Sequence, residues 1–361
     1  MLARMRAFAS ALFVCRLLGA AASKDGICVL YANDDTRTFF FSGVSPSGAL
    51  SPQLLALPSW DAVLVGLDAG EDDDTFYIAP QGVGSSPNVT VATLRTRNDS
   101  SSAVVTYATL GQVPGFPAPF TSMNTLHLDP SRAQMIATLI GLDGPPPARA
   151  RRSARRQQTP PLRDPGDLWY VVADVFPSNG SISRVWLDLS EQDMRWGQAA
   201  ISGVSAFDGT SYWVNPISGD VPSGQALYGF PLNGSAPTVV PYGSAPNLAH
   251  LFYSAPLRGL LAVLESDVGA PRLARFSPPS ANFSTIFEWS ADGLEDWGVY
   301  DVSPNGTLLL AVLVDKNGEN PAISLVDLEL LKEVRRTPLK GFSSADTLCD
   351  INFCNYLAPA D

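Results

Sequence analysis

The chain has 361 residues, of which 45% are hydrophobic and only 16% charged, so it can bury a large core and is not globally disordered. Its formal net charge of −11 argues against nucleic acid and anionic membrane surfaces as partners. The 29 glycines and 30 prolines punctuate short apolar runs, which is typical of many strands joined by many turns.

Residues 1–22 have the layout of a secretory leader. Arg4 and Arg6 precede an apolar run over 7–15, and the small residues of 20–22 form a site that signal peptidase accepts before Ser23. We therefore expect a signal peptide over 1–22, one mature domain over 23–361, and a location outside the cell or in the secretory-pathway lumen. An uncleaved N-terminal helix is the alternative, because Arg16 interrupts the apolar stretch. No later segment has the roughly 18 uninterrupted apolar residues that span a bilayer, so we expect no membrane span.

The first mature segment predicts two strands within residues 27–44. They match the second and third strands of a unit near the C-terminus, where a first strand starts at Gly298 and a second at Leu308. The N-terminal unit lacks such a first strand. Residues 347–357 supply a candidate, which predicts a ring closed by pairing the two ends of the chain.

Three cysteines follow the leader, and in an oxidising compartment they predict one disulfide and one spare thiol. Cys28 with Cys349, or alternatively with Cys354, would join the two ends, whereas Cys349 with Cys354 would close only a small local loop.

A run of four carboxylates precedes the segment that starts at Thr75. Oxygen ligands suit calcium, but the run lacks the alternating spacing of an EF-hand loop, so a solvated turn competes with a calcium site. The four residues are Glu71, Asp72, Asp73 and Asp74. We expect no other cofactor, since the chain has two histidines and no Cys-x-x-Cys pair.

Six Asn-x-Ser/Thr sequons occur, nearly all in predicted turns, and together with the leader they predict glycosylated surface loops. The acceptors are Asn88, Asn98, Asn179, Asn233, Asn282 and Asn305.

Residues 144–167 form a Pro- and Arg-rich insertion with six arginines and two aspartates, which predicts an exposed, disordered basic loop. Arg149, Arg151 and Arg152 complete an Arg-x-Arg-Arg pattern that resembles a proprotein convertase site, with cleavage before Ser153. A solvated basic linker in contact with the acidic body is the competing interpretation.

A repeat of about 48 residues runs through the chain. Thr210, Gly259 and Thr307 mark the same turn at steps of 49 and 48 residues, and Gln134 and Thr75 continue the series upstream. Each unit reads as four short antiparallel strands, which predicts six blades, with seven as the alternative.

The strand layout, and phrases such as those over 301–312 and 128–137, resemble the β-propeller superfamily, with no particular family matched. The fold expected from this resemblance is all-β: a single propeller with six blades, or alternatively seven, of four antiparallel strands each. Propeller first strands line a central channel, so the resemblance implies that His127 and His250 approach the axis.

Several side chains that recur in the repeat have structural interpretations. Aspartates near the ends of first strands are expected to cap turn N–H groups; they are Asp129, Asp208 and Asp301. Four tryptophans are expected to pack between blades; they are Trp60, Trp213, Trp289 and Trp297.

The predicted function is a secreted or luminal glycoprotein, monomeric, that binds a protein or a small molecule at the channel mouth or the loop face. The alternative is a hydrolase or lyase with an axial site that uses His127 and His250 as bases or metal ligands. A third hypothesis is a precursor processed after Arg152.

Overall fold

The computed structural model describes the following residues, and all structural statements below refer to them: 26–33, 35–36, 38–51, 55–57, 62–69, 75–82, 90–97, 100–111, 120–129, 134–142, 168–176, 178–188, 204–215, 225–243, 248–264, 270–278, 282–290, 294–303, 306–315, 320–342 and 346–354.

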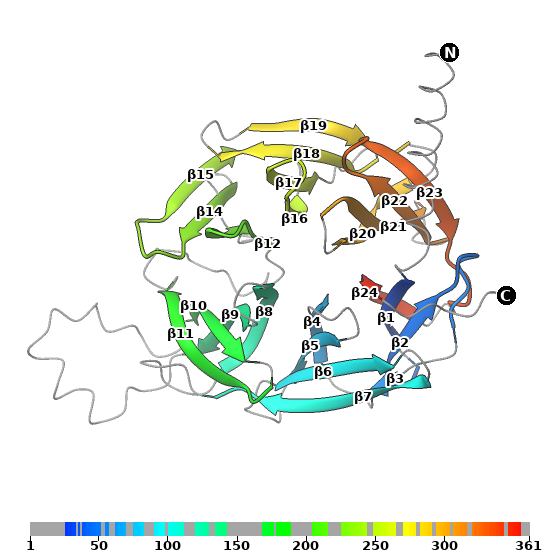
Figure 1. Ribbon diagram of the computed structural model, residues 1–361, viewed down its shortest axis with the longest axis horizontal. Coiled ribbons are helices and arrows are strands. Elements are labelled where there is room, and N and C mark those ends of the chain that lie inside the picture. The colour runs from blue at the N-terminus through cyan, green and yellow to red at the C-terminus, as the bar shows by residue number, and fades with distance from the viewer. Residues whose placement is uncertain are drawn as a thin grey trace, which may run out of the picture.

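The described residues form six four-stranded antiparallel sheets arranged in a ring (Figure 1). Blade 2 is built from β4 (Ala62–Ala69), β5 (Thr75–Gly82), β6 (Thr90–Arg97) and β7 (Ser100–Thr109). Blade 3 is built from β8 (Phe120–Asp129), β9 (Gln134–Leu142), β10 (Leu168–Phe176) and β11 (Ser181–Asp188). Blade 4 is built from β12 (Val204–Phe207), β13 (Ser211–Asn215), β14 (Gln225–Pro231) and β15 (Thr238–Gly243).

Blade 5 is built from β16 (Leu248–Ser254), β17 (Gly259–Leu264), β18 (Arg272–Ser277) and β19 (Asn282–Glu288). Blade 6 is built from β20 (Leu294–Val302), β21 (Leu308–Asp315), β22 (Ala322–Asp327) and β23 (Lys332–Pro338). In every blade the first strand lies nearest the centre of the ring (Figure 1). The chain is therefore a six-bladed β-propeller, as its repeat predicts.

Blade 1 combines both ends of the chain. It consists of β24 (Asp346–Cys354), β1 (Gly26–Asn33), β2 (Thr38–Val44) and β3 (Leu55–Leu57), in that order. Strand β24 pairs antiparallel with β1 from Gly26↔Cys354 to Asn33↔Asp346. The predicted closure, with one strand from the C-terminus and three from the N-terminus, is confirmed.

The core lies between the blades, and this explains the continuous apolar runs. On β17, Leu260 packs toward blade 4 while the adjacent Leu261 packs toward blade 6. Strand β21 repeats this alternation with Leu309 and Leu310, which face blade 5 and blade 1. A central strand buried on both faces has no solvent side, so alternate polar residues disappear from its sequence.

Because the strands of a blade are antiparallel, the first–second and third–fourth connections lie on one face of the ring. We call this face the turn face. It carries the turns 208–210 between β12 and β13 and 255–258 between β16 and β17, and residues 303 and 306–307 between β20 and β21.

Candidate functional site

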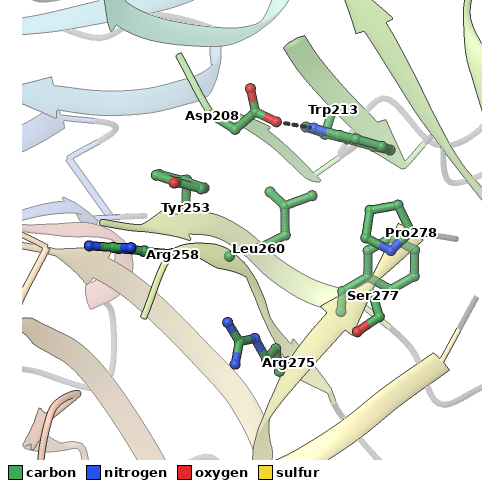
Figure 2. A pocket seen from close by; sticks show the side chains of 10 residues that line it. Asp208, Trp213, Tyr253, Arg258, Leu260, Arg275, Ser277 and Pro278 are labelled. Atoms are coloured by element: carbon green, nitrogen blue, oxygen red, sulfur yellow. Dashed lines mark hydrogen bonds between the residues drawn. The ribbon is translucent and has the colours of Figure 1, made fainter. Parts of the chain in front are cut away.

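A pocket of about 460 Å³ opens on the turn face between blades 4 and 5. Blade 4 contributes Asp208 and Trp213, and blade 5 contributes residues of three successive segments: Tyr253 on β16, Arg258 beside β17, and Arg275 on β18 (Figure 2). We call it the inter-blade pocket.

Asp208 organises the blade 4 side of the pocket. Its Oδ1 accepts hydrogen bonds from the Thr210 backbone N–H, the Thr210 hydroxyl and the Ser211 N–H at 2.7–2.8 Å, and Oδ2 accepts one from Trp213 Nε1 at 2.8 Å. This is the turn-capping role expected from the sequence. Burial alone would raise the pKa of the Asp208 carboxyl, but the bonds from Trp213, Ser211 and Thr210 outweigh burial and lower the pKa from its ordinary value of 3.8.

Two guanidinium groups line the blade 5 side. Arg275 Nη2 donates to the Leu257 carbonyl at 2.5 Å, which fixes this side chain beneath the turn. A Cβ at Gly259 would lie 3.1 Å from Arg275 Nε, so the missing side chain gives the guanidinium its room. Arg258 adopts the left-handed backbone conformation, with φ of 49°, at the last position of the same turn. Both arginine side chains are exposed at the rim of the pocket.

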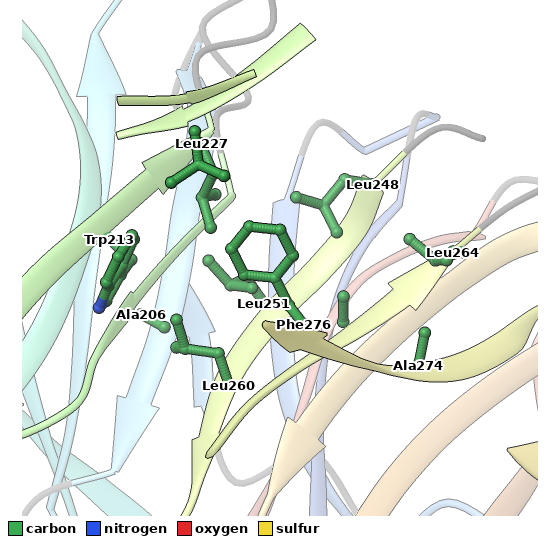
Figure 3. Packing of buried hydrophobic residues seen from close by; sticks show 11 residues of the cluster. Ala206, Trp213, Leu227, Leu248, Leu251, Leu260, Leu264, Ala274 and Phe276 are labelled. Atoms are coloured by element: carbon green, nitrogen blue, oxygen red, sulfur yellow. The ribbon is translucent and has the colours of Figure 1, made fainter. Parts of the chain in front are cut away.

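The apolar wall of the pocket is continuous with the core between blades 4 and 5 (Figure 3). Leu260 and Phe276 are 4% and 2% exposed and belong both to this core and to the pocket lining. The Trp213 ring packs closely against Gly229 of β14. A Cβ at Gly229 would lie only 2.6 Å from the ring. Trp213 and Trp289 are both buried in cores between blades, as expected, whereas the side chains of Trp60 and Trp297 lie outside the described part.

His250 lies at the interface between blades 5 and 6. Its ring is 5.7 Å from the Phe252 ring and 5.9 Å from the Tyr300 ring, centroid to centroid, and both neighbours are buried in the core of that interface. The backbone of His127 lies in β8 opposite Ile136, but its side chain is outside the described part.

Asp301 makes a contact between blades that the sequence does not predict. Its Oδ2 accepts a hydrogen bond of 3.0 Å from the Phe353 N–H of β24, so it links blade 6 to blade 1. In the same turn, the Ser303 hydroxyl accepts a hydrogen bond of 2.9 Å from the Leu308 N–H. The side chain of Asp129 is outside the described part.

Three sequon acceptors are exposed: Asn179 and Asn233 on third–fourth connections, and Asn282 as the first residue of β19. Asn179 Oδ1 accepts the Ser181 N–H, and Asn233 Oδ1 accepts both the N–H and the hydroxyl of Ser235. The acceptors Asn88, Asn98 and Asn305 lie outside the described residues.

Cys28 is fully buried on β1, and Cys349 and Cys354 both occur in the paired strand β24. Only the backbone of the last two is described.

The other predicted features lie outside the described residues. They are the leader 1–22, the carboxylates Glu71–Asp74, the insertion 144–167, and the cleavage pattern at Arg149, Arg151, Arg152 and Ser153. Among the residues that are described, no three His, Cys, Asp or Glu side chains gather as a metal site. That part of the chain also has no helix long and apolar enough to cross a membrane.

Sequence reasoning missed Tyr253, Arg258 and Arg275 as pocket residues. These residues lie in separate segments of blade 5. The sequence repeat identifies only apolar and turn positions, so it gives no signal for these three side chains. Arg258 directly precedes the turn marker Gly259, but its conjunction with Arg275 arises only when β17 and β18 pair.

No protein-family model matches the chain, and no curated protein matches it in sequence. Solved structures do match its fold. TolB from Acinetobacter baumannii is 10% identical, with a TM-score of 0.53, over 94% of this chain and 70% of that chain. The Nidogen/Laminin complex gives a match at 12% identity and a TM-score of 0.50, over 91% and 98% of the two chains. The periplasmic gluconolactonase PpgL of Pseudomonas aeruginosa is 13% identical, with a TM-score of 0.51, over 94% and 98%. At these identities the likeness shows the fold alone.

Proposed function

We propose that this six-bladed β-propeller is an extracytoplasmic, N-glycosylated binding module. The observation that carries the proposal is the inter-blade pocket, a concave site with charged and apolar walls on the turn face. The fold serves protein binding in at least one matched structure, since nidogen was crystallised in complex with laminin.

The leader and the sequons support the extracytoplasmic location. Asn179, Asn233 and Asn282 are accessible to an oligosaccharyl transfer enzyme because each side chain is exposed in or beside a turn. Expression of the full chain in secreting eukaryotic cells should yield protein in the medium that starts near Ser23 and loses mass after enzymatic removal of N-glycans. Retention in the cytosol without glycans would contradict this part of the proposal.

Binding is tested with the secreted protein itself. Fluorescently labelled mature protein, added to cultured cells on their own extracellular matrix, should bind saturably and be displaced by excess unlabelled protein. Non-saturable binding, or none, would contradict the binding function.

The second candidate is an axial-site hydrolase or lyase that uses His127 and His250. The packing of the His250 ring between Phe252 and Tyr300 favours the binding function instead, because that ring is engaged at a blade interface. We expect His250→Phe to fold with the wild-type affinity for cells and matrix. A hydrolytic or lyase activity of the secreted protein that His127→Ala and His250→Phe both abolish would favour the enzyme.

We propose that Cys28 pairs with Cys349, or alternatively with Cys354, and so joins the two ends of the chain. The support is that Cys28 is disulfide-bonded and that the strand beside it carries both candidates. In the loop-entropy model a bridge across some 300 residues contributes several kcal/mol. Non-reducing peptide mapping should recover a Cys28 peptide linked to residues of β24, and a free Cys28 thiol would refute the bridge.

Processing after Arg152 remains a further proposal, supported by the Arg-x-Arg-Arg pattern in a segment between β9 and β10. Reducing gels of protein from convertase-competent cells should show two fragments, and Arg152→Ala should restore one chain. A single uncut wild-type chain would contradict processing.

A further inference from the structure

We propose that the inter-blade pocket binds a small organic carboxylate with an apolar body. The proposal deepens the binding function above and rests on it for one point, the glycans that limit the size of the ligand.

The positive charge of the pocket selects an anion. Arg258 and Arg275 come from adjacent segments of blade 5 and line the same pocket in a chain whose net charge is −11. Within the described part of the chain, the Arg258 side chain has no hydrogen-bond or ion-pair partner, and Arg275 uses Nη2 to hold the Leu257 carbonyl. N–H groups of both arginines are therefore available to a ligand. A planar guanidinium matches a carboxylate better than a point charge does, because two parallel hydrogen bonds can form.

The one carboxylate of the lining does not cancel this charge where the ligand would bind. Figure 2 shows Asp208 and Arg275 on opposite sides of the pocket. The Asp208 oxygens accept four hydrogen bonds from its own turn and from Trp213, which stabilise its negative charge locally. The pocket thus has a cationic blade 5 side that can receive an anionic group.

The apolar lining requires a hydrophobic body beside that group. Leu260 and Phe276 form the floor shared with the core, and Trp213 and Pro278 add apolar surface (Figure 3 shows the first three). A volume of about 460 Å³ lies within the range of small-molecule sites. An inorganic anion would leave this apolar surface in contact with water.

Two proposed glycans limit the ligand to a small molecule. Asn233 lies in the third–fourth connection of blade 4. Asn282 is the first residue of β19, the strand that follows this connection in blade 5, four residues after the pocket residue Pro278. Both therefore share the turn face with the pocket, one on each of the two blades that form it. Glycans at these positions would obstruct a protein surface but leave room for a small ligand.

The test uses three probes on the secreted, glycosylated protein. Isothermal calorimetry compares 3-phenylpropionate with its neutral isostere 3-phenylpropionamide and with inorganic sulfate. We expect the carboxylate to bind about 10-fold or more tightly than the amide, since charge-assisted hydrogen bonds to arginine are lost with the charge. We also expect it to bind more tightly than sulfate. Equal affinity for the amide or for sulfate, or no binding of the carboxylate, would overturn the proposal.

Variants assign the binding to the pocket. Arg258→Gln should weaken 3-phenylpropionate binding about 10-fold without a change in Tm, because Arg258 is exposed and makes no side-chain bond within the described residues. Lys332→Gln is the matched control: it removes one exposed positive charge from β23, outside the pocket, and should leave the affinity unchanged. Arg275→Gln should also weaken binding, with a small loss of Tm from the Leu257 contact. Equal losses in the Arg258 and Lys332 variants would show a general charge effect and refute the site.

Failure of this proposal and failure of the binding function give different results. Saturable binding to cells and matrix without 3-phenylpropionate binding would refute the pocket ligand alone. Binding of the probe without any cell or matrix binding would refute the module function alone.

Discussion

Two neighbouring interfaces of the ring meet solvent differently on the turn face. Between blades 5 and 6, the turn at Gly306 packs onto the turn at Ala255 and Pro256, and the Ser254 hydroxyl reaches the Gly306 carbonyl at 3.5 Å. We call this the closed interface. Between blades 4 and 5, the inter-blade pocket opens instead. We call this the open interface.

The polar contacts near the two interfaces differ as well. Asp208 binds back onto its own turn and onto Trp213, so the blade 4 turn is complete without its neighbour. At the closed interface the contacts cross between blades: Trp289 Nε1 donates to the Ser324 hydroxyl, which donates to Glu333. The hydrogen bonds of Asp208 thus stay within blade 4, whereas the bond from Trp289 to Ser324 joins blade 5 to blade 6.

The largest expected difference concerns adjacent leucines on β17. Leu261→Ala should cost about 3–4 kcal/mol, because its side chain is fully buried in the closed interface and leaves a cavity. Leu260→Ala should cost about 2 kcal/mol, because one side of Leu260 already borders the pocket. Urea unfolding measures the free energy of unfolding of both variants. Equal decreases would mean that the two interfaces are packed alike.

A smaller difference is expected for the hydroxyls. Ser324→Ala should cost about 2 kcal/mol, since it leaves the buried Trp289 Nε1 without its acceptor. Thr210→Val removes an exposed hydroxyl that bonds to Asp208 and should cost no more than about 0.5 kcal/mol. If Thr210→Val lowered the free energy of unfolding as much as Ser324→Ala, the hydroxyl at the closed interface would not contribute more to stability than the one at the open interface.

The two turn glycines give the next contrast. Both have positive φ, 69° at Gly306 and 88° at Gly209, so alanine is strained at either position by about 1 kcal/mol. At Gly306 the added Cβ would also lie 3.3 Å from Pro256 and 3.4 Å from the Ala255 nitrogen, which raises the expected cost to about 1.5 kcal/mol. Chemical denaturation of the two variants should rank Gly306→Ala as less stable, and the reverse order would show that the blade 6 turn does not press on blade 5.

A further effect is a pH dependence at the open interface. The pKa of Asp208 is lowered in the folded chain, so the charged carboxylate stabilises the fold above its unfolded pKa of about 3.9, and this contribution is lost as pH falls through the lower folded pKa. Asp208→Asn keeps the shape but cannot titrate and loses the acceptor for Trp213. Wild type should therefore exceed this variant in stability by about 1 kcal/mol at pH 7, with the difference shrinking below about pH 4. A constant difference from pH 7 to pH 2.5 would refute the role of the Asp208 charge.

Much of the fold follows from local patterns. Turn markers at Thr75, Gln134, Thr210 and Gly259 fall at or within one residue of the start of β5, β9, β13 and β17. Asp208 was recognised as a turn cap because an aspartate beside Gly209 bonds N–H groups close to it in sequence. The hydrogen bond between Asp301 and Phe353 was not predicted, since Phe353 lies 52 residues away in another blade.

The sequence by itself determined the four-stranded blade repeat and the closure through both ends of the chain, and it favoured six blades over seven. These features depend on periodic apolar runs and turn residues, which act over a few positions. Only the tertiary structure decided which interface is open. Whether Asp208 or Gly306 meets a neighbour depends on how two separately specified blades pack, and the meeting of Arg258 with Arg275 depends on strand pairing. A contact between segments that are distant in sequence leaves no pattern in either segment, so the pocket could not be predicted from the sequence.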